Sequence, residues 1–176
     1  MRLAQQGDGT WKAWTLLTTL EELHAYPDGR PPAQSDAEKF SRDFGGENWA
    51  DQRRRAQSYE DRDPTVLVVG GGQAGLSAAA RLSHLGVDTL IIDREERIGD
   101  NWRKPYHSLT LHNEVHVNHL PLMPFPPTFP VFIPKDKLAN WFEHYVDSLD
   151  LNFWTGTELA GGSWDGKARR WTVTLK

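Results

Sequence analysis

The stretch Val66-Leu67-Val68-Val69-Gly70-Gly71-Gly72-Gln73-Ala74-Gly75 decides the fold of this chain. Its four leading apolar residues run straight into the pattern Gly-x-Gly-x-x-Gly, and small and apolar residues at helical spacing follow. A strand, a glycine turn and a helix in this order form the context that the dinucleotide-binding fingerprint requires. The stretch therefore predicts an α/β fold of the Rossmann type, with βαβ units, a parallel sheet and a phosphate site at the turn.

Each position of the fingerprint has a physical purpose. Gly70 permits the tight turn out of the strand, Gly72 lets the backbone approach a pyrophosphate, and Gly75 lets the helix pack closely on the strand. Gln73 and Ala74 begin the helix, whose unpaired N–H groups and positive dipole end favour a bound phosphate. We predict that these five residues contact a dinucleotide.

A second strand is expected after this helix. The helix has an apolar face formed by Leu76, Ala79, Ala80 and Leu82. Gly86 is a typical helix stop, and the apolar residues within 87–92 predict the second parallel strand. Asp93 closes that strand at about the separation expected for a carboxylate that accepts a ribose hydroxyl, and Arg94 follows it.

Composition limits the class of protein. The 176 residues carry a formal net charge of −4 and contain no cysteine, which excludes disulfides and thiol chemistry. The charge gives no reason to expect a nucleic-acid partner, and Arg53-Arg54-Arg55 is typical of a solvated helix face. No apolar run reaches membrane-spanning length, and the first residues do not form a secretory signal. We therefore expect a soluble, cytoplasmic protein with no membrane partner.

Three zones follow one another along the chain. Residues 9–20, rich in Trp, Thr and Leu, predict one strand without a partner beside it, and residues 21–23 add a helical turn. Residues 26–63 are rich in Pro, Gly and charges and predict a linker, with a short helix at Trp49–Ser58. Residues 64–176 form the expected α/β domain.

The end of the α/β domain has its own helix and strands. Residues 135–149 carry apolar side chains at spacings of three and four, which predicts an amphipathic helix starting after Pro134. Short strands are expected at 152–154, 157–160 and 170–175. The last two would form a β-hairpin around the turn Asp165-Gly166.

Between the second strand and this helix lie several further motifs. They are Gly-x-x-Trp at Gly99–Trp102, Tyr106, Leu-x-Leu-His at Leu109–His112 and Leu-Pro-x-Met-Pro-Phe-Pro at Leu120–Pro126. Together with the glycine turn and Asp93, they make residues 64 to about 150 resemble flavin-containing monooxygenases, most closely the YUCCA-type branch and its fungal relatives.

The resemblance implies that the turn binds FAD, with Asp93 on the adenosine ribose and Gly99, Asn101 and Trp102 lining the FAD cleft. NADPH reduces the flavin in such enzymes, which then insert one oxygen atom into a small organic substrate. Family members often place an Asn beside the flavin where this chain has His112, followed by Asn113; a His also occurs there in the YUCCA branch. These two residues are the candidates near the flavin.

The resemblance also implies that parts of such enzymes are missing. The chain has no second glycine fingerprint for NADPH, and residues 1–25 resemble a remnant of a small α+β domain that precedes the FAD domain in some fungal members. We therefore expect a chain truncated at both ends. A non-catalytic remnant that binds FAD or another dinucleotide is one alternative to a monooxygenase, and an NAD(P)-dependent dehydrogenase is a weaker one.

The same segment permits two other interpretations. His112, His116 and His119 have spacings that would suit a metal on a helix, but the prolines that follow argue against a helix, so we expect no metal site. Pro121-x-x-Pro124 fits a polyproline ligand, but a packed loop anchored by Leu120, Phe125 and Phe129 is favoured.

Overall fold

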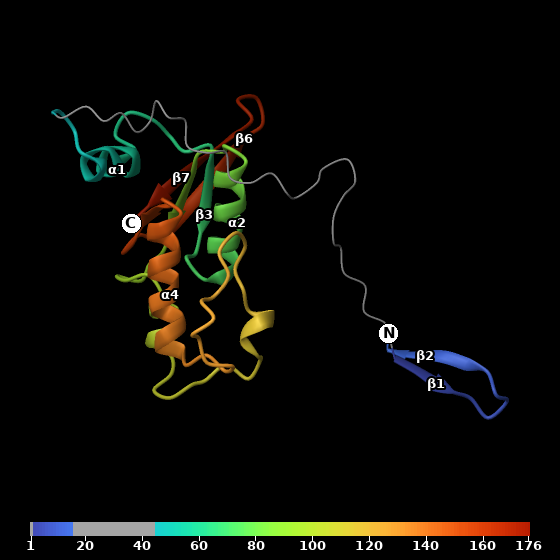
Figure 1. Ribbon diagram of the computed structural model, residues 1–176. Coiled ribbons are helices and arrows are strands. Elements are labelled where there is room, and N and C mark those ends of the chain that lie inside the picture. Colours follow the sequence, from blue (N-terminus) through green and yellow to red (C-terminus); the bar gives the residue numbers. More distant parts are fainter. Residues whose placement is uncertain (1, 16–44) are drawn as a thin grey trace. The chain divides into compact units, whose positions relative to one another are not determined.

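The computed structural model describes residues 2–15 and 45–176, and the chain divides into two compact units, Met1–Arg42 and Asp43–Lys176 (Figure 1). The predicted division into 1–25, 26–63 and 64–176 remains a prediction. The expected helical turn at 21–23 and the part of the expected linker before residue 45 lie outside the described residues.

In the first unit, β1 (Arg2–Gln5) and β2 (Trp11–Thr15) form an antiparallel hairpin. Asp8 accepts a hydrogen bond from the N–H of Thr10, and Gly9 has φ +83°, so the two strands join in a tight turn. The prediction of a strand without a partner was therefore wrong. The partner was missed because residues 2–5 do not alternate clearly between apolar and polar side chains.

The second unit is built on a three-stranded parallel sheet. Its strands are β3 (Val66–Val69), β4 (Thr89–Ile92) and β5 (Asn152–Trp154), in the order β3-β4-β5. The crossover from β3 to β4 is α2 (Gln73–His84), and Gly86 follows it with φ +77°. The α/β fold of Rossmann type, with βαβ units and a parallel sheet, is thus confirmed.

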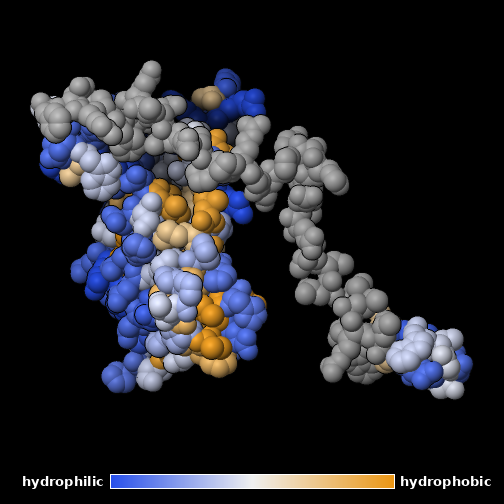
Figure 2. All heavy atoms as spheres, in the orientation of Figure 1, coloured by the Kyte–Doolittle hydropathy of each residue, from blue (hydrophilic) through white to orange (hydrophobic). Residues whose placement is uncertain are grey.

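The core lies between the sheet and two helices. α2 buries Leu76, Ala79 and Ala80 and packs on β3 and β4, while α4 (Lys135–Ser148) contacts α2. All four residues of β4 are buried, as expected for the central strand of a parallel sheet. Apolar side chains also remain on the surface of this unit, and Figure 2 shows some of this apolar surface. The large exposed ones on β3 and the long loop include Val69, Val117, Val131 and Phe132.

The long segment between β4 and α4 contains little regular structure. α3 (Asp100–Arg103) is one short turn, and Val115–Val117 forms a single 3-10 turn, η2. Leu120 and Phe125 are buried, and the hydroxyl of Tyr145 donates to the carbonyl of Pro121 at 2.7 Å. The packed loop is therefore confirmed over a free polyproline segment.

The unit ends in an antiparallel hairpin of β6 (Leu159–Asp165) and β7 (Arg170–Leu175). The hairpin was predicted, but β6 begins at Leu159 and extends to Asp165. The Asp165 carboxylate accepts from the N–H groups of Lys167 and Ala168, so the turn runs on past Gly166. In the described ranges, 2–15 and 45–176, the helices are too short or too polar to cross a membrane.

Helix α1 (Trp49–Ser58) matches the predicted short helix. It starts with a capping box, in which Asn48 and Asp51 each accept from the other's backbone N–H. α1 falls in the predicted linker but contacts β5, where the indole N–H of Trp154 donates to the carbonyl of Gln57 at 2.6 Å. This helix therefore belongs to the same compact unit as the sheet.

Candidate dinucleotide-binding site

The glycine turn leaves β3 at the carboxyl end of the sheet. Gly70 donates its N–H to the carbonyl of Ile92 at 2.8 Å and has φ +101°, a conformation that side chains disfavour. No other atom lies within 4 Å of where its Cβ would stand. Gly70 is therefore required for the shape of the turn, as the fingerprint predicts.

Gly75 is required because a side chain at this position has no room. A Cβ at this position would overlap the carbonyl oxygen of Gly70, and the carbonyl carbon would lie only 3.1 Å away. Backbone atoms cannot swing aside as the end of a side chain can. The close approach of α2 to the end of β3 therefore depends on this glycine.

The first turn of α2 has free donors. The helix is capped by Gly72, which supplies no side-chain hydrogen bond, and its first intrahelical bond runs from the N–H of Leu76 to the carbonyl of Gly72 at 2.9 Å. The N–H groups that precede Leu76 in the helix have no intrahelical acceptor. Gln73 and Ala74 lie exposed in this turn. The helix thus presents unpaired N–H groups and its positive end at the turn, which suits an anion.

Asp93 stands at the end of β4 and is held by backbone groups. Its carboxylate accepts from the N–H of Gly71 at 2.6 Å and from the N–H of Glu95 at 2.8 Å. Its own N–H donates to the carbonyl of Trp154 at 3.0 Å. An ionised carboxylate has about four acceptor positions, so two remain for a ligand hydroxyl.

Two buried polar side-chain atoms on α3 have no partner within the described residues. They are Oδ1 of Asn101 and Nε1 of Trp102. The amide nitrogen of Asn101 would lie 3.3 Å from a Cβ on Gly72, so its side chain faces the turn. Buried polar atoms are normally hydrogen-bonded, so unpaired ones here fit a ligand that supplies the missing partners. The residues present therefore fit a dinucleotide.

The structure gives a steric reason for a glycine at position 99 that the motif did not reveal. It has φ +87°, and a Cβ there would lie 2.6 Å from the carbonyl oxygen of Ala139 and 2.8 Å from its Cα. The glycine therefore allows α3 to pack against α4. Its predicted place in a cofactor cleft stays a prediction.

Charges hold α3 in place. Burial alone would raise the pKa of Asp100, but hydrogen bonds and charge from Arg103 and Lys104 hold it below its usual value. Arg103 also donates to the carbonyl of Ile98 at 2.7 Å. Asn101 and Trp102 are thus carried on a turn that is fixed on both sides.

The other predicted residues are more loosely placed. Arg94 is exposed, and its nearest acidic partner is Glu95 at 3.8 Å. His112 and Asn113 are exposed in the long loop, and within residues 2–15 and 45–176 neither side chain makes a hydrogen bond to the turn. Their predicted nearness to a flavin remains untested.

The histidines do not converge. His116 pairs with Glu114 at 3.2 Å, and Nδ1 of His119 accepts from the N–H of Phe125 at 3.0 Å. In the described part of the chain no three His, Asp or Glu side chains are grouped to hold a metal ion.

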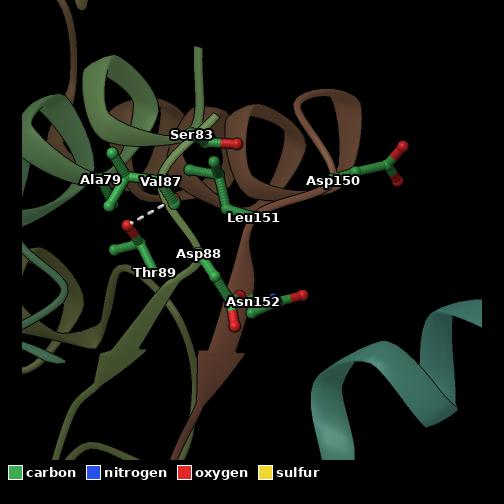
Figure 3. A pocket seen from close by; sticks show the side chains of 8 residues that line it. All are labelled: Ala79, Ser83, Val87, Asp88, Thr89, Asp150, Leu151 and Asn152. Carbon is green, nitrogen blue, oxygen red and sulfur yellow. Dashed lines mark hydrogen bonds between the residues drawn. The ribbon is translucent and has the colours of Figure 1, made fainter. Parts of the chain in front are cut away.

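Two pockets of the second unit lie away from the glycine turn. One, of about 320 Å³, is lined by residues of α1 and α4. The other, of about 60 Å³, is lined by Ala79, Ser83, Val87, Asp88, Thr89, Asp150, Leu151 and Asn152 (Figure 3). These residues surround the amino ends of β4 and β5, whereas ligands of parallel α/β sheets bind outside the carboxyl ends. The turn is therefore the better candidate for the dinucleotide site than the smaller pocket.

Sequence reasoning missed one position of the turn. Gly71 is buried, and a Cβ there would lie 2.6 Å from Cε2 of Phe153 and closer still to its Cζ. The only signal in the sequence is a glycine at a place where the fingerprint does not require one. Phe153 itself looked like any apolar residue of a short strand.

Comparison with known proteins supports the Rossmann fold and the family resemblance. The NAD(P)-binding Rossmann-like domain family matches residues 68–124. Indole-3-pyruvate monooxygenase YUCCA1 of Oryza sativa subsp. japonica is 29% identical over 126 residues, which are 71% of this chain and 31% of that protein. Probable indole-3-pyruvate monooxygenase YUCCA4 of Arabidopsis thaliana is 32% identical over 62% of this chain and 27% of its own length.

A solved structure gives the same result. The flavin-containing monooxygenase from Stenotrophomonas maltophilia superposes with a TM-score of 0.58 at 27% identity, covering 63% of this chain and 33% of that one. The chain thus spans about a third or less of the length of these relatives. The resemblance carried by the motifs is confirmed: the Rossmann region of this chain is similar to part of the flavin-containing monooxygenases.

Proposed function

We propose that this chain binds FAD at the glycine turn and is the FAD-binding part of an NADPH-dependent monooxygenase that acts on a small organic substrate. The observation that carries the proposal is the turn itself. Free N–H groups at the start of α2 and a fixed acceptor, Asp93, face the same end of the sheet.

Different residues of the site would bind different parts of FAD. The N–H groups of Gly72, Gln73 and Ala74 would bind the pyrophosphate, because they are donors without intrahelical partners. Asp93 would accept a hydroxyl of the adenosine ribose, with Arg94 beside it.

The flavin half would lie toward α3. Asn101 and Trp102 would supply polar groups there, since each has a buried atom without a partner among residues 2–15 and 45–176, and Gly99 sets the position of α3. His112 and Asn113 are proposed near the flavin on the strength of the family resemblance. When bound, FAD supplies the redox chemistry, accepting reducing equivalents from NADPH and passing them to oxygen.

The first experiment measures binding. FAD is added to the purified chain, excess is removed, and the visible spectrum and a fluorescence titration give stoichiometry and affinity; NAD⁺ and NADPH are titrated in parallel. We expect one FAD per chain with weak retention, because the turn is open to solvent at Gln73 and Ala74. Binding of a nicotinamide dinucleotide without any binding of FAD would support the dehydrogenase alternative instead.

The second experiment measures turnover. NADPH is added in air and its absorbance is followed. We expect no NADPH oxidation by these 176 residues alone, because they contain a single glycine fingerprint. FAD binding without oxidation also describes a non-catalytic FAD-binding protein, so adding in trans the segments of a relative that this chain does not match separates the two. Measured turnover by the chain itself would contradict our expectation. A cytoplasmic location and the absence of nucleic-acid and membrane partners are part of the same proposal.

A further inference from the structure

We propose that Phe153 is a positioning residue of the dinucleotide site. Its ring fixes the turn at Gly71 and, through the N–H of Gly71, the Asp93 carboxylate. The inference rests on the proposed function, since it concerns how the same site is held ready for the adenosine half of its ligand.

The starting observation is that Gly71 differs from Gly70. Gly71 lacks the positive φ of its neighbour, so its backbone conformation is open to other residues. What excludes a side chain is the ring of Phe153, which occupies the space beside its Cα. The Phe153 ring therefore packs directly against the backbone of the turn.

The position that a Cβ of Gly71 would occupy also lies next to Asp93. A Cβ on Gly71 would also lie 3.2 Å from Oδ2 of Asp93, the oxygen that accepts the N–H of Gly71 at 2.6 Å. The ring thus borders the hydrogen bond that joins the turn to the carboxylate. Asp93 is tied to β5 as well, because its N–H donates to the carbonyl of Trp154, the residue after Phe153.

Phe153 is itself held by the core. It stands in β5 paired with Ile91 of the central strand, and its side chain packs against the buried cluster. The ring cannot leave the turn without leaving that packing. Through Phe153, the third strand of the sheet therefore determines where the glycine turn and the carboxylate lie.

The contact is side chain against backbone, which makes it testable by non-additivity. Cζ and Cε2 are the free end of a side chain, so Gly71→Ala would displace the ring and leave the backbone path intact. In a Phe153→Leu background those two atoms are absent, and the closest remaining neighbour of the added methyl group is Oδ2 of Asp93 at 3.2 Å. The two substitutions should therefore be coupled.

The experiment measures FAD affinity for the parent chain, Phe153→Leu, Gly71→Ala and the double variant. We expect about tenfold weaker binding for Phe153→Leu and a loss of about fivefold for Gly71→Ala, in the range of measured couplings between touching residues. Gly71→Ala should cost less than about twofold once Phe153 is Leu. Equal effects of Gly71→Ala in both backgrounds, or unchanged affinity for Phe153→Leu, would overturn the proposal.

Two controls separate positioning from packing. Phe142→Leu removes ring atoms from a buried side chain of α4 and should lower the unfolding midpoint while leaving FAD affinity within about twofold. Gly161→Ala adds a methyl group where no atom lies within 4 Å and should change neither. If Phe142→Leu weakens FAD binding as much as Phe153→Leu does, then Phe153 acts only through core packing and has no positioning role.

A second readout needs no ligand. Phe153→Leu should speed hydrogen exchange of the Gly71 amide by about tenfold, because its bond to Asp93 loses its support, while the Val173 amide in β7 is unchanged. A parent chain that does not bind FAD would refute the proposed function and still leave this measurement. Unchanged exchange at Gly71 would refute the role of Phe153, whether or not FAD binds.

Discussion

The amino and carboxyl ends of the parallel sheet satisfy their polar groups differently. At the amino end, four side chains form hydrogen bonds with one another. We call this group the Tyr59 clasp, and it consists of Tyr59, Arg62, Asp88 and Asn152. Asp88 accepts from the Tyr59 hydroxyl at 2.7 Å and from Nε of Arg62 at 3.2 Å, and the Asn152 amide donates to the same hydroxyl at 2.8 Å. At the carboxyl end, the first-turn N–H groups of α2 have no acceptor inside the helix.

This difference favours the carboxyl end as the proposed place for an anion. Among the described residues, the buried side-chain atom without a partner at the amino end is an acceptor, Oδ1 of Asn152. At the carboxyl end, the first turn of α2 offers donors and the positive end of the helix. The small pocket at the amino end is therefore a poor place for a phosphate. Substitutions at the two ends should separate ligand affinity from stability.

The largest effect is expected at Gly75. Gly75→Ala puts a methyl group against the carbonyl oxygen of Gly70, so either the turn or the start of α2 must move. We expect a loss of about 3 kcal/mol in the free energy of unfolding, typical of severe overpacking, and no measurable FAD binding. Chemical denaturation and FAD titration check this, with Gly161→Ala as the open-space control; tight FAD binding by Gly75→Ala would show that the turn is not the site.

Asp93 comes next. Asp93→Ala removes the ribose acceptor and leaves the N–H of Gly71 without its partner. Hydrogen bonds to charged groups contribute about 1.5–3 kcal/mol, so FAD should bind about 10- to 100-fold more weakly. Fluorescence titration measures this, and Asp165→Ala, which loses a carboxylate that also caps backbone N–H groups in the β6–β7 turn, is the matched control and should bind FAD as the parent does.

A substitution in the Tyr59 clasp should have the opposite profile. Asp88→Ala removes the acceptor of Tyr59 and Arg62. Loss of the part-buried Tyr59 hydrogen bond should lower the free energy of unfolding by about 1 kcal/mol, and the exposed pair with Arg62 adds little. FAD affinity should stay within about twofold of the parent value. If Asp88→Ala weakens FAD binding as much as Asp93→Ala does, the two ends are not separate.

The smallest effect concerns Tyr145, which ties α4 to the long loop. Tyr145→Phe loses the hydrogen bond to Pro121 and should cost about 1 kcal/mol at neutral pH. Burial raises the pKa of Tyr145 to about 12, against an ordinary value of 10.0. Because the folded pKa is the higher one, its contribution is complete below pH 10 and is lost as pH rises toward 12.

Denaturation at neutral pH and between pH 10 and 12 checks this on the parent and on Tyr145→Phe. The Phe variant should show a shallower alkaline loss. An equal slope for the two proteins would mean that the phenol of Tyr145 ionises as freely in the folded chain as in the unfolded one.

The elements that sequence patterns predicted well are those set by local spacing. The strand at 66–69, the helix after the glycine turn and the short helix around Trp49–Ser58 were predicted from the local sequence, and each was found. The same holds for Gly70 and Gly75, whose requirements come from the turn itself. Requirements that arise between neighbours in the sequence can be predicted from the sequence.

Contacts between distant residues were not predictable in this way. The bond from Trp154 to Gln57 joins positions 97 apart, and the packing of Phe153 on Gly71 joins the third strand to the first turn. Gly99 was assigned to a cofactor cleft by its motif, whereas its closest neighbour is Ala139 of α4. A glycine in a motif shows that space is needed there and does not show which atom needs it.

The most direct test of the central claim is a map of backbone amide shifts in the nuclear magnetic resonance spectrum as FAD is added to the labelled chain. We predict that the amides of Gly70 through Gly75 and of Asp93 shift, together with Asn101, while those of Tyr59, Asp88 and Asn152 stay in place. Shifts confined to the Tyr59 clasp, with the glycine turn unchanged, would contradict the assignment of the dinucleotide to the carboxyl end of the sheet.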